Sequence, residues 1–248
     1  AYTPSVYRVE KAGEAIRLIL DEERKQENPP IKLVYSNFKE LGNILSLLGI
    51  EKISGILFDL GLSSFQLSDR RGFSFLLDTP LDMRMDPRIY RPAEYYVNNL
   101  SAQELTELLR DYGQERGAFY IARGIEASRK RETIKTTGEL VGIILNSLPR
   151  RFWPRRIHPA TRTFQALRIR VNNELEILGP SLEEAISRLI PGGRICVLAY
   201  HSLEDRIVKQ VFKKRAKGHF RILTLKPLRP SSEELKKNPR ARSAHLRA

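Results

Sequence analysis

Acidic side chains at the ends of predicted strands are the residues of this chain best placed for chemistry. The apolar run Ile53–Leu60 carries a single acid, Asp59, near its end, and Gly61 with two serines follows at once. Buried parallel strands have this pattern, and open α/β sheets bind ligands at the carboxyl ends of their strands. Burying a lone carboxylate there is costly unless it has a partner. Asp59 is therefore a candidate ligand-binding residue, and a capping or turn residue is the alternative.

Two further polar groups follow predicted strands in the same way. Glu10 ends the short segment Val6–Val9, where a carboxylate can accept both hydroxyl hydrogens of a ribose diol or favourably begin a helix. A third group follows the apolar run 194–200. It consists of His201, Glu204 and Asp205.

Several common catalytic and cofactor motifs are missing from the sequence. No two glycines have the G-x-G spacing, which argues against a nicotinamide oxidoreductase and against a P-loop nucleotidase. The sequence has no H-E-x-x-H and no C-x-x-C, so it does not predict a metal site. It also lacks the G-x-S-x-G of serine hydrolases.

Composition indicates a globular chain with an ample core. The 248 residues are 41% hydrophobic, and no apolar run approaches a membrane span. We see no secretory signal. The single cysteine, Cys196, lies within a predicted strand and excludes a disulfide inside one chain, so the sequence predicts a cytoplasmic protein without a membrane partner.

Positive charge is the second strong signal. The formal net charge is +14 and the pI is near 10. Residues 150–173 contain seven arginines and no acid, and residues 206–229 contain nine lysines or arginines and no acid. Aromatic residues are interleaved with the arginines of 150–156. Such segments suit phosphate contact and base stacking, and a solvated basic surface is the alternative.

Hydrophobic periodicity predicts α/β structure at both ends of the chain and helices in the middle. We predict strands at 6–9, 31–35, 53–60, 194–200 and 220–225. We predict helices at 12–24, 41–48, 101–112, 117–130, 137–148, 182–190 and 203–215. Ser101 and Glu104 have the spacing of a capping box. Pro191–Gly193 predicts a turn, and the tail after Pro227 is expected to be extended. The alternation over residues 6–60 is typical of a parallel sheet.

Seven motifs in series resemble one protein family. They are Asp59-Leu-Gly-Leu-Ser-Ser-Phe-Gln-Leu67, Arg71-Gly-Phe-Ser-Phe75, Pro80-Leu-Asp-Met-Arg-Met-Asp86, Ala160-Thr-Arg-Thr-Phe-Gln-Ala-Leu-Arg-Ile169 with Val171-Asn-Asn-Glu-Leu175, Pro191-Gly-Gly-Arg194, His201-Ser-Leu-Glu-Asp-Arg-Ile-Val-Lys209 and Asn238-Pro-Arg-Ala-Arg-Ser243. This order is similar to that of the bacterial small-subunit ribosomal RNA cytosine-N4 methyltransferases, the RsmH/MraW family. The resemblance runs from about Val6 to the C-terminus.

The resemblance implies an α/β fold, namely the Rossmann-like sheet of class I S-adenosylmethionine (SAM)-dependent methyltransferases with an inserted helical domain. Residues 1–77 and 161–248 would form the SAM-binding domain, and residues 78–160 the inserted substrate-binding domain. Four positions match the family's cofactor contacts. They are Glu10, Phe38, Asp59 and Gln66.

The implied reaction is methyl transfer to the exocyclic N4 of a cytidine in small-subunit ribosomal RNA. N4 is a poor nucleophile, so the site must align it with the methyl group and accept its hydrogens. The candidate catalytic residues are Asp82, His201, Ser202 and Glu204. The candidate RNA-binding residues are Arg150, Arg151, Arg155, Arg156 and Arg162. The expected partner is ribosomal RNA or the small ribosomal subunit, and the oligomeric state stays open, with a dimer among the options.

The N-terminus departs from the family pattern. Members of the family have a strand and a Gly-rich loop that cradles the methionine part of SAM between the segment matched by Tyr2–Pro4 and the strand matched by Val6–Glu10. This sequence has no counterpart of that loop. One interpretation is a hidden break between Ser5 and Val6, and the other is a truncated, catalytically inactive RNA-binding homologue. A small-molecule methyltransferase is a third hypothesis, which the basic segments disfavour.

Overall fold

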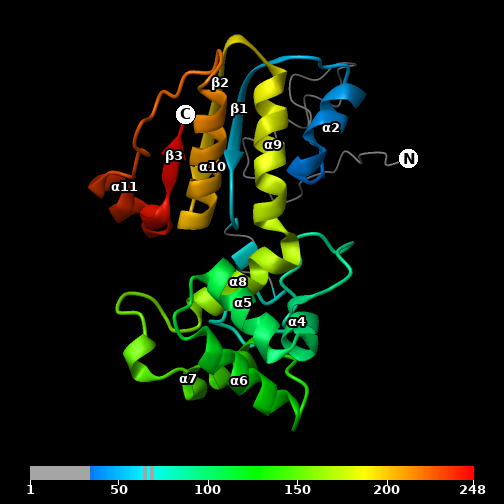
Figure 1. Cartoon of the computed structure of the whole chain (residues 1–248), viewed down its shortest axis with the longest axis vertical. Helices are drawn as coiled ribbons and strands as arrows, with labels where there is room; N and C mark the ends of the chain where they lie inside the picture. The colour runs from blue at the N-terminus through cyan, green and yellow to red at the C-terminus, as the bar shows by residue number, and fades with distance from the viewer. Residues whose placement is uncertain (1–33, 64–65, 68–69) are drawn as a thin grey trace. The chain divides into compact units, whose positions relative to one another are not determined.

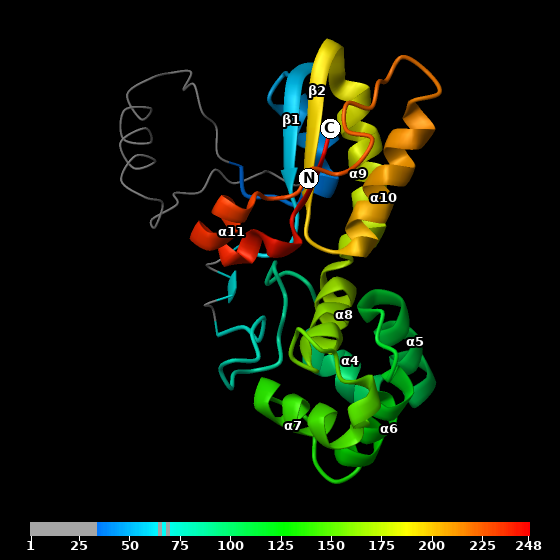
Figure 2. The same ribbon diagram turned by 90° about the vertical axis from the view of Figure 1, so that its left-hand side faces the viewer.

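The computed structural model describes residues 34–63, 66–67 and 70–248, in which a run of helices separates β1 from β2 (Figures 1 and 2). The strands of this part are β1 (Ile53–Asp59), β2 (Leu189–Ala199) and β3 (His245–Arg247). Its α-helices are α2 (Leu41–Leu47), α4 (Ala93–Asn99), α5 (Ala102–Gly113), α6 (Ala118–Arg129), α7 (Thr137–Ser147), α8 (Thr161–Asn172), α9 (Glu174–Arg188), α10 (Ser202–Arg215) and α11 (Ser232–Lys237). Its 3₁₀ helices are η1 (Phe38–Glu40), η2 (Arg150–Phe152) and η3 (Pro239–Ser243).

The chain divides into two compact units. The described residues up to Ile56 belong with Pro180–Ile195 to the first unit, and Leu57–Gly179 with Cys196–Ala248 form the second. These boundaries differ from those of the predicted SAM-binding and inserted helical domains. The division into those two domains therefore stays a prediction.

A three-stranded sheet has the order β1-β2-β3, and Figure 2 shows β1 and β2 side by side. β2 and β3 are antiparallel, with Val197 opposite Arg247. β1 and β2 run parallel, because Gly55 lies against the Arg194 carbonyl and the Leu60 N–H donates to the Leu198 carbonyl further along both strands, at 3.1 Å. The predicted α/β class is confirmed.

Helices α4 to α8 form the core of the second unit. α5 packs against α6 and α8, and α6 packs against α7. Their apolar faces are fully buried, with Leu109, Ile121 and Leu140 each 0% exposed. A Cβ at Gly113 would lie 2.6 Å from the Arg162 carbonyl oxygen, so only glycine allows α5 and α8 to approach this closely.

Local sequence signals fix the ends of these helices. Ser101 accepts a hydrogen bond from the Glu104 N–H at 3.2 Å, and the Glu104 carboxylate accepts one from the Ser101 N–H at 2.8 Å. This is the predicted capping box, and Thr136 and Glu139 form a second one before α7. The helices predicted at 41–48, 101–112, 117–130, 137–148 and 203–215 are confirmed with ends shifted by at most about two residues.

Three predictions about the C-terminal third are wrong. The turn predicted at Pro191–Gly193 lies inside β2, where Gly192 adopts a φ of 82° and lets the strand bend. Residues 220–225 form no strand, and the tail after Pro227 is not extended but contains α11, η3 and β3. β3 has three residues, and a segment this short depends on its partner strand and on α10, against which it packs, rather than on its own sequence.

Several N-terminal predictions lie outside the described residues. They are the strand at 6–9, the helix at 12–24, Glu10 and the break between Ser5 and Val6. Of the strand expected at 31–35, only Val34 and Tyr35 are described, and neither is in a strand. In the described part of the chain, no helix combines the length and hydrophobicity that a membrane crossing needs.

Candidate functional site

Asp59 and Tyr200 meet at the carboxyl ends of two neighbouring parallel strands. Asp59 is the last residue of β1, and its carboxylate is exposed. Its Oδ1 accepts a hydrogen bond from the Tyr200 hydroxyl at 2.8 Å. Gly61 adopts a φ of 83°, and a Cβ there would lie 3.3 Å from the Tyr200 ring. The turn after β1 therefore depends on glycine to bring the carboxylate and the phenol together.

The phenol of Tyr200 is a firm hydrogen-bond donor. Burial raises the pKa of Tyr200 to about 12, and the hydrogen bond and charge of Asp59 and the charge of Glu204 act in the same direction. Tyr200 is therefore neutral at pH 7 and holds the Asp59 carboxylate in one orientation. A fixed, solvent-accessible carboxylate can accept hydrogen bonds from hydroxyl or ammonium groups of a ligand.

The other two described cofactor candidates are placed differently. Gln66 accepts a hydrogen bond from the Ser63 N–H at 2.9 Å and donates its own N–H to Ser63 Oγ at 3.2 Å. This reciprocal pair shapes the loop after Asp59, while the amide NH₂ of a glutamine remains a donor. Phe38 is half-buried in η1 and belongs to the first unit, whereas Asp59 and Gln66 belong to the second.

His201 and Glu204 form the N-terminal cap of α10. The His201 Nδ1 accepts a hydrogen bond from the Glu204 N–H at 3.3 Å. The Glu204 Oε2 in turn accepts from the N–H groups of Tyr200 at 2.8 Å and His201 at 3.2 Å. A nitrogen that accepts cannot carry a proton, so the neutral imidazole holds its hydrogen on Nε2. That atom lies 3.2 Å from Glu204 Oε1, and this geometry favours a capping role for His201 over proton abstraction.

Glu204 is an ionised carboxylate inside the protein. It is 2% exposed. Burial alone raises the pKa of Glu204, but the hydrogen bond from His201, the N–H of Tyr200 and the charge of Arg168 together lower it below its ordinary value. Its negative charge is therefore kept by neighbours rather than by water.

Arg168 binds a second acid of the same cluster, Glu174, whose side chain is 11% exposed. Its Nε and Nη2 donate to the two carboxylate oxygens of Glu174 at 2.8 and 2.7 Å. Glu174, His201 and Glu204 bring ligand atoms within 4.8 Å of one another. The arginine fork and the backbone N–H groups already bind the two carboxylates, so this geometry is explained without a metal ion.

Asp82 lies in a loop with an unusual backbone. Its Oδ1 accepts from Arg84 Nε at 2.7 Å, and its Oδ2 accepts from Arg84 Nη2 at 3.0 Å. Burial raises the pKa of Asp82, but hydrogen bonds and charge from Arg84 outweigh it and lower the pKa below its ordinary value. The next residue, Met83, is buried with a φ of 61°, which costs about 1 to 3 kcal/mol for a non-glycine residue.

Asn172 holds this loop, and sequence reasoning did not single it out. Its Nδ2 donates to the Met83 carbonyl at 2.8 Å and to the Arg168 carbonyl at 2.9 Å, and its Oδ1 accepts from the Met85 N–H at 2.8 Å. The only signal in the sequence was its place in the motif 171–175. Asn172 thus links the Asp82 loop to α8, the helix that carries Arg168. Arg168 in turn binds Glu174, which lies near His201.

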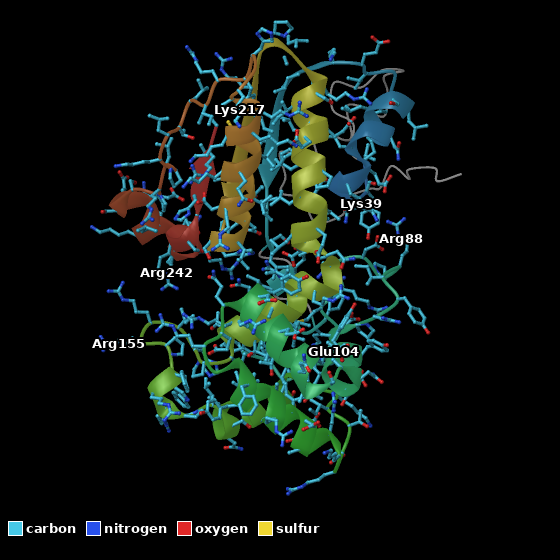
Figure 3. All side chains as sticks on the ribbon, in the orientation of Figure 1. Lys39, Arg88, Glu104, Arg155, Lys217 and Arg242 are labelled. Carbon is cyan, nitrogen blue, oxygen red and sulfur yellow. The ribbon has the colours of Figure 1, made fainter. Side chains whose placement is uncertain are left out.

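Ser202 and the arginines complete the set of predicted residues. The Ser202 hydroxyl donates to Gln114 Oε1 at 2.8 Å and is exposed. Arg162 is half-buried in the first turn of α8. Arg150, Arg151, Arg155 and Arg156 are exposed, and Figure 3 shows Arg155 extending away from the ribbon. Structure thus brings Asp59, His201, Ser202 and Glu204 to the ends of β1 and β2, and joins Asp82 to them through intervening residues.

Comparisons with known proteins identify the family. A model of the MraW methylase family matches residues 7–248. Ribosomal RNA small subunit methyltransferase H of Thermomicrobium roseum is 49% identical over 231 residues, which cover 86% of this chain and 70% of the relative. The proteins of the same name from Persephonella marina and Clostridioides difficile are 46% and 44% identical, covering 87% and 88% of this chain and 74% and 75% of those relatives. The chain belongs to the MraW methylase family.

Proposed function

We propose that this methylase transfers a methyl group from SAM to the N4 of a cytidine in small-subunit ribosomal RNA. The observation that carries the proposal is the exposed Asp59 carboxylate, fixed by Tyr200 at the carboxyl ends of parallel strands, in a chain of a methylase family. The names of the relatives state that they are ribosomal RNA small subunit methyltransferases. They give no support to the alternative of an inactive RNA-binding homologue.

The residues around Asp59 fit SAM as the cofactor. The cofactor supplies an electrophilic methyl group on a sulfonium. Asp59 would accept hydrogen bonds from the polar groups of SAM, and Gln66 would donate from its amide beside it. Glu10 and Phe38 complete the proposed cofactor contacts, on the ribose and beside the adenine.

The polar residues of the second unit divide into two proposed roles. Asp82 and Ser202 would face the cytosine, because an ionised carboxylate and a hydroxyl can accept the hydrogens of N4 and so make its lone pair more available. His201 and Glu204 would act less directly. They fix the start of α10, and with it the position of Ser202.

The arginines are proposed to hold the RNA. Arg155, Arg156 and Arg162 would contact phosphates, which gives affinity without reading the sequence. A base in an RNA helix must leave the stack before N4 can reach the methyl group. The partner would be free ribosomal RNA or the small ribosomal subunit in the cytoplasm, as a monomer or a dimer.

Transfer of labelled methyl groups tests this proposal. The protein is incubated with tritiated SAM and small ribosomal subunits or their RNA, and the RNA is digested to nucleosides. Label in N4-methylcytidine is expected, and label in another nucleoside or in none would overturn the proposal. Calorimetric titration with SAM should show an affinity about tenfold or more weaker for Asp59→Ala, because a hydrogen bond to a charged group is removed.

The matched control for Asp59→Ala is Glu107→Ala, which removes another exposed acid of the second unit. It should leave SAM affinity unchanged. Equal SAM affinity in the Asp59 variant and the unsubstituted protein would show that this carboxylate does not bind the cofactor.

A further inference from the structure

Aromatic rings from two elements gather at the surface of the second unit. Phe119 and Tyr120 lie in the first turn of α6, Phe152 ends η2, and Trp153 follows it. The ring centroids of Phe119 and Tyr120 are 5.7 Å apart, and those of Tyr120 and Phe152 are 5.6 Å apart. We call these three residues, together with Trp153, which follows Phe152 in the chain and has Arg150 over its ring, the ring cluster. A Cβ at Gly117 would lie 2.1 Å from Leu148 Cδ1 and 3.4 Å from the Phe152 Cβ, so glycine lets the start of α6 approach the segment 148–152 closely.

The ring cluster is open to solvent at one end. Phe119 is 59% exposed, whereas Ile121, two residues further along α6, is fully buried. Trp153 is fixed, because its Nε1 donates to the Leu148 carbonyl at 2.9 Å. The exposed Phe119 ring packs edge-on against Tyr120, at 81° between the ring planes, and offers an apolar ring face at little cost in side-chain entropy.

Two arginines pack against rings of the ring cluster. The guanidinium carbon of Arg150 is 3.9 Å from the centre of the Trp153 ring. That of Arg151 is 5.0 Å from the centre of the Phe152 ring, and its Nη2 donates to the Tyr120 hydroxyl at 3.0 Å. These distances are typical of cation–π contacts. The arginines of 150–156 are therefore not equivalent, since Arg155 and Arg156 have no aromatic ring among their contacts in the described part of the chain.

We propose that the ring cluster, with Arg150 and Arg151, binds an unpaired base of RNA by stacking. The inference rests on the proposed function and specifies how its RNA substrate is held. Charge complementarity selects the occupant, because residues 150–173 contain seven arginines and no acid. Every base has a π face that stacks on aromatic rings and on guanidinium planes. In a duplex these faces are covered by neighbouring bases, so the surface should prefer single-stranded RNA.

Stacking and phosphate binding respond differently to salt, which makes the proposal testable. Binding of a fluorescently labelled single-stranded oligoribonucleotide is measured from low to high salt. Phe119→Leu keeps an apolar side chain and removes the ring, and should weaken binding by about 5- to 150-fold, the value of one base–aromatic stack. The slope of log affinity against log salt should not change, because the variant still neutralises the same phosphates. Its melting temperature should also stay unchanged, since the ring is exposed.

Trp153 gives a second readout that does not need catalysis. It is the single tryptophan of the sequence, so stacking of a base on the ring cluster should quench the intrinsic fluorescence of the protein. Single-stranded RNA should quench it more strongly than a blunt duplex of the same composition. Equal quenching by both, or an unchanged affinity of Phe119→Leu, would overturn the stacking proposal.

The outcomes also separate this proposal from the proposed function. If the protein methylates cytidine but Phe119→Leu binds RNA normally, only the stacking surface is refuted. If Phe119→Leu binds naked RNA normally and has a weaker affinity only for assembled subunits, the surface contacts a ribosomal protein and the proposal is wrong. If the unsubstituted protein binds no RNA and transfers no methyl group, the proposed function fails with it.

Discussion

Arg168 carries the charge that allows two acidic side chains to lie inside the second unit, so its replacement by methionine should destabilise that unit strongly. The side chains of Arg168 and Glu174 are only 15% and 11% exposed, with Nη2 and Oε2 2.7 Å apart. Arg168 also lowers the pKa of Glu204, whose side chain is 3% exposed. Methionine keeps most of the volume of the arginine stem and removes the charge and the donors.

The magnitude follows from the burial of the pair. Removing one partner of a buried ion pair costs about 3 to 5 kcal/mol, because the other charge is left without compensation. For a domain of about 150 to 250 residues, 1 kcal/mol shifts the melting temperature by about 2 to 4 °C. Arg168→Met should therefore lower the melting temperature by roughly 6 to 20 °C. Urea unfolding followed by circular dichroism gives the free energy of unfolding directly.

A double-mutant cycle separates the ion pair from a simple change in packing. Glu174→Gln removes the acid and keeps its shape, and in the double variant Arg168→Met/Glu174→Gln neither charge remains. Since a neutral pair often replaces a buried ion pair without a decrease in stability, the double variant should recover much of the stability that Arg168→Met removes. If the two destabilisations simply add, or if Arg168→Met costs less than about 1 kcal/mol, the value of a surface pair, the cluster is not held by this charge.

Three further predictions concern the 83–85 loop, the basic segment 150–156 and the decrease of stability at acidic pH. Asn172→Ala should cost about 2 to 4 kcal/mol in urea unfolding, because two backbone groups of the 83–85 loop lose their partner; a cost below about 0.5 kcal/mol, the range of ordinary surface substitutions, would contradict this. Replacing Arg155 and Arg156 by glutamine should flatten the plot of log RNA affinity against log salt by roughly 0.7 to 0.9 for each phosphate that the variant no longer neutralises, and an unchanged slope would assign them to solvated surface. The pKa of Asp205 is lowered first by its hydrogen bond to an arginine of β3, so its contribution to stability is complete above the unfolded value near 4 and is lost as the pH falls through the folded value. Asp205→Asn should therefore melt at a temperature that depends less on pH between about 6 and 3 than that of the unsubstituted protein.

Sequence patterns predicted those elements whose signals are local. The N-terminal cap of α5 is an example, because Ser101 lies three residues from its partner Glu104 and needs nothing else from the fold. β1 was predictable from its apolar run and from the glycine that follows Asp59. The C-terminal segment was not, since a three-residue strand is stabilised by pairing with β2 rather than by its own composition. Its polar residues suggested an extended tail, and tertiary contacts decided otherwise.

In the candidate site, too, local motifs were predictable and tertiary partners were not. The family motifs predicted that Asp59, Asp82, His201 and Glu204 belong to one functional site. The sequence did not indicate which residues hold their side chains in place. Tyr200 and Arg168 lie 141 and 6 positions from the acids they bind. These partners come together only in the folded chain. Neither their spacing nor their residue type identifies them in the sequence.

The hydrogen bonds of the site narrow the identity of the group that receives the proton from N4. The His201 Nδ1 accepts a hydrogen bond from the Glu204 N–H in the first turn of α10, and its Nε2 faces the buried Glu204 carboxylate. Neither nitrogen is therefore open to a substrate. Glu204 is satisfied by two backbone N–H groups. An aminium formed at N4 by methyl transfer is strongly acidic, so its proton needs an acceptor near the solvent rather than a base of high pKa. Among the described candidates, Asp82 meets that condition as a carboxylate whose charge is held by Arg84, whereas the exposed Ser202 hydroxyl can accept a hydrogen bond from N4 and relay its proton to water. Under the proposed function, the capping box of α10 positions Ser202, while Arg84 and Asn172 position Asp82, and the chemistry at N4 is assigned to these two residues.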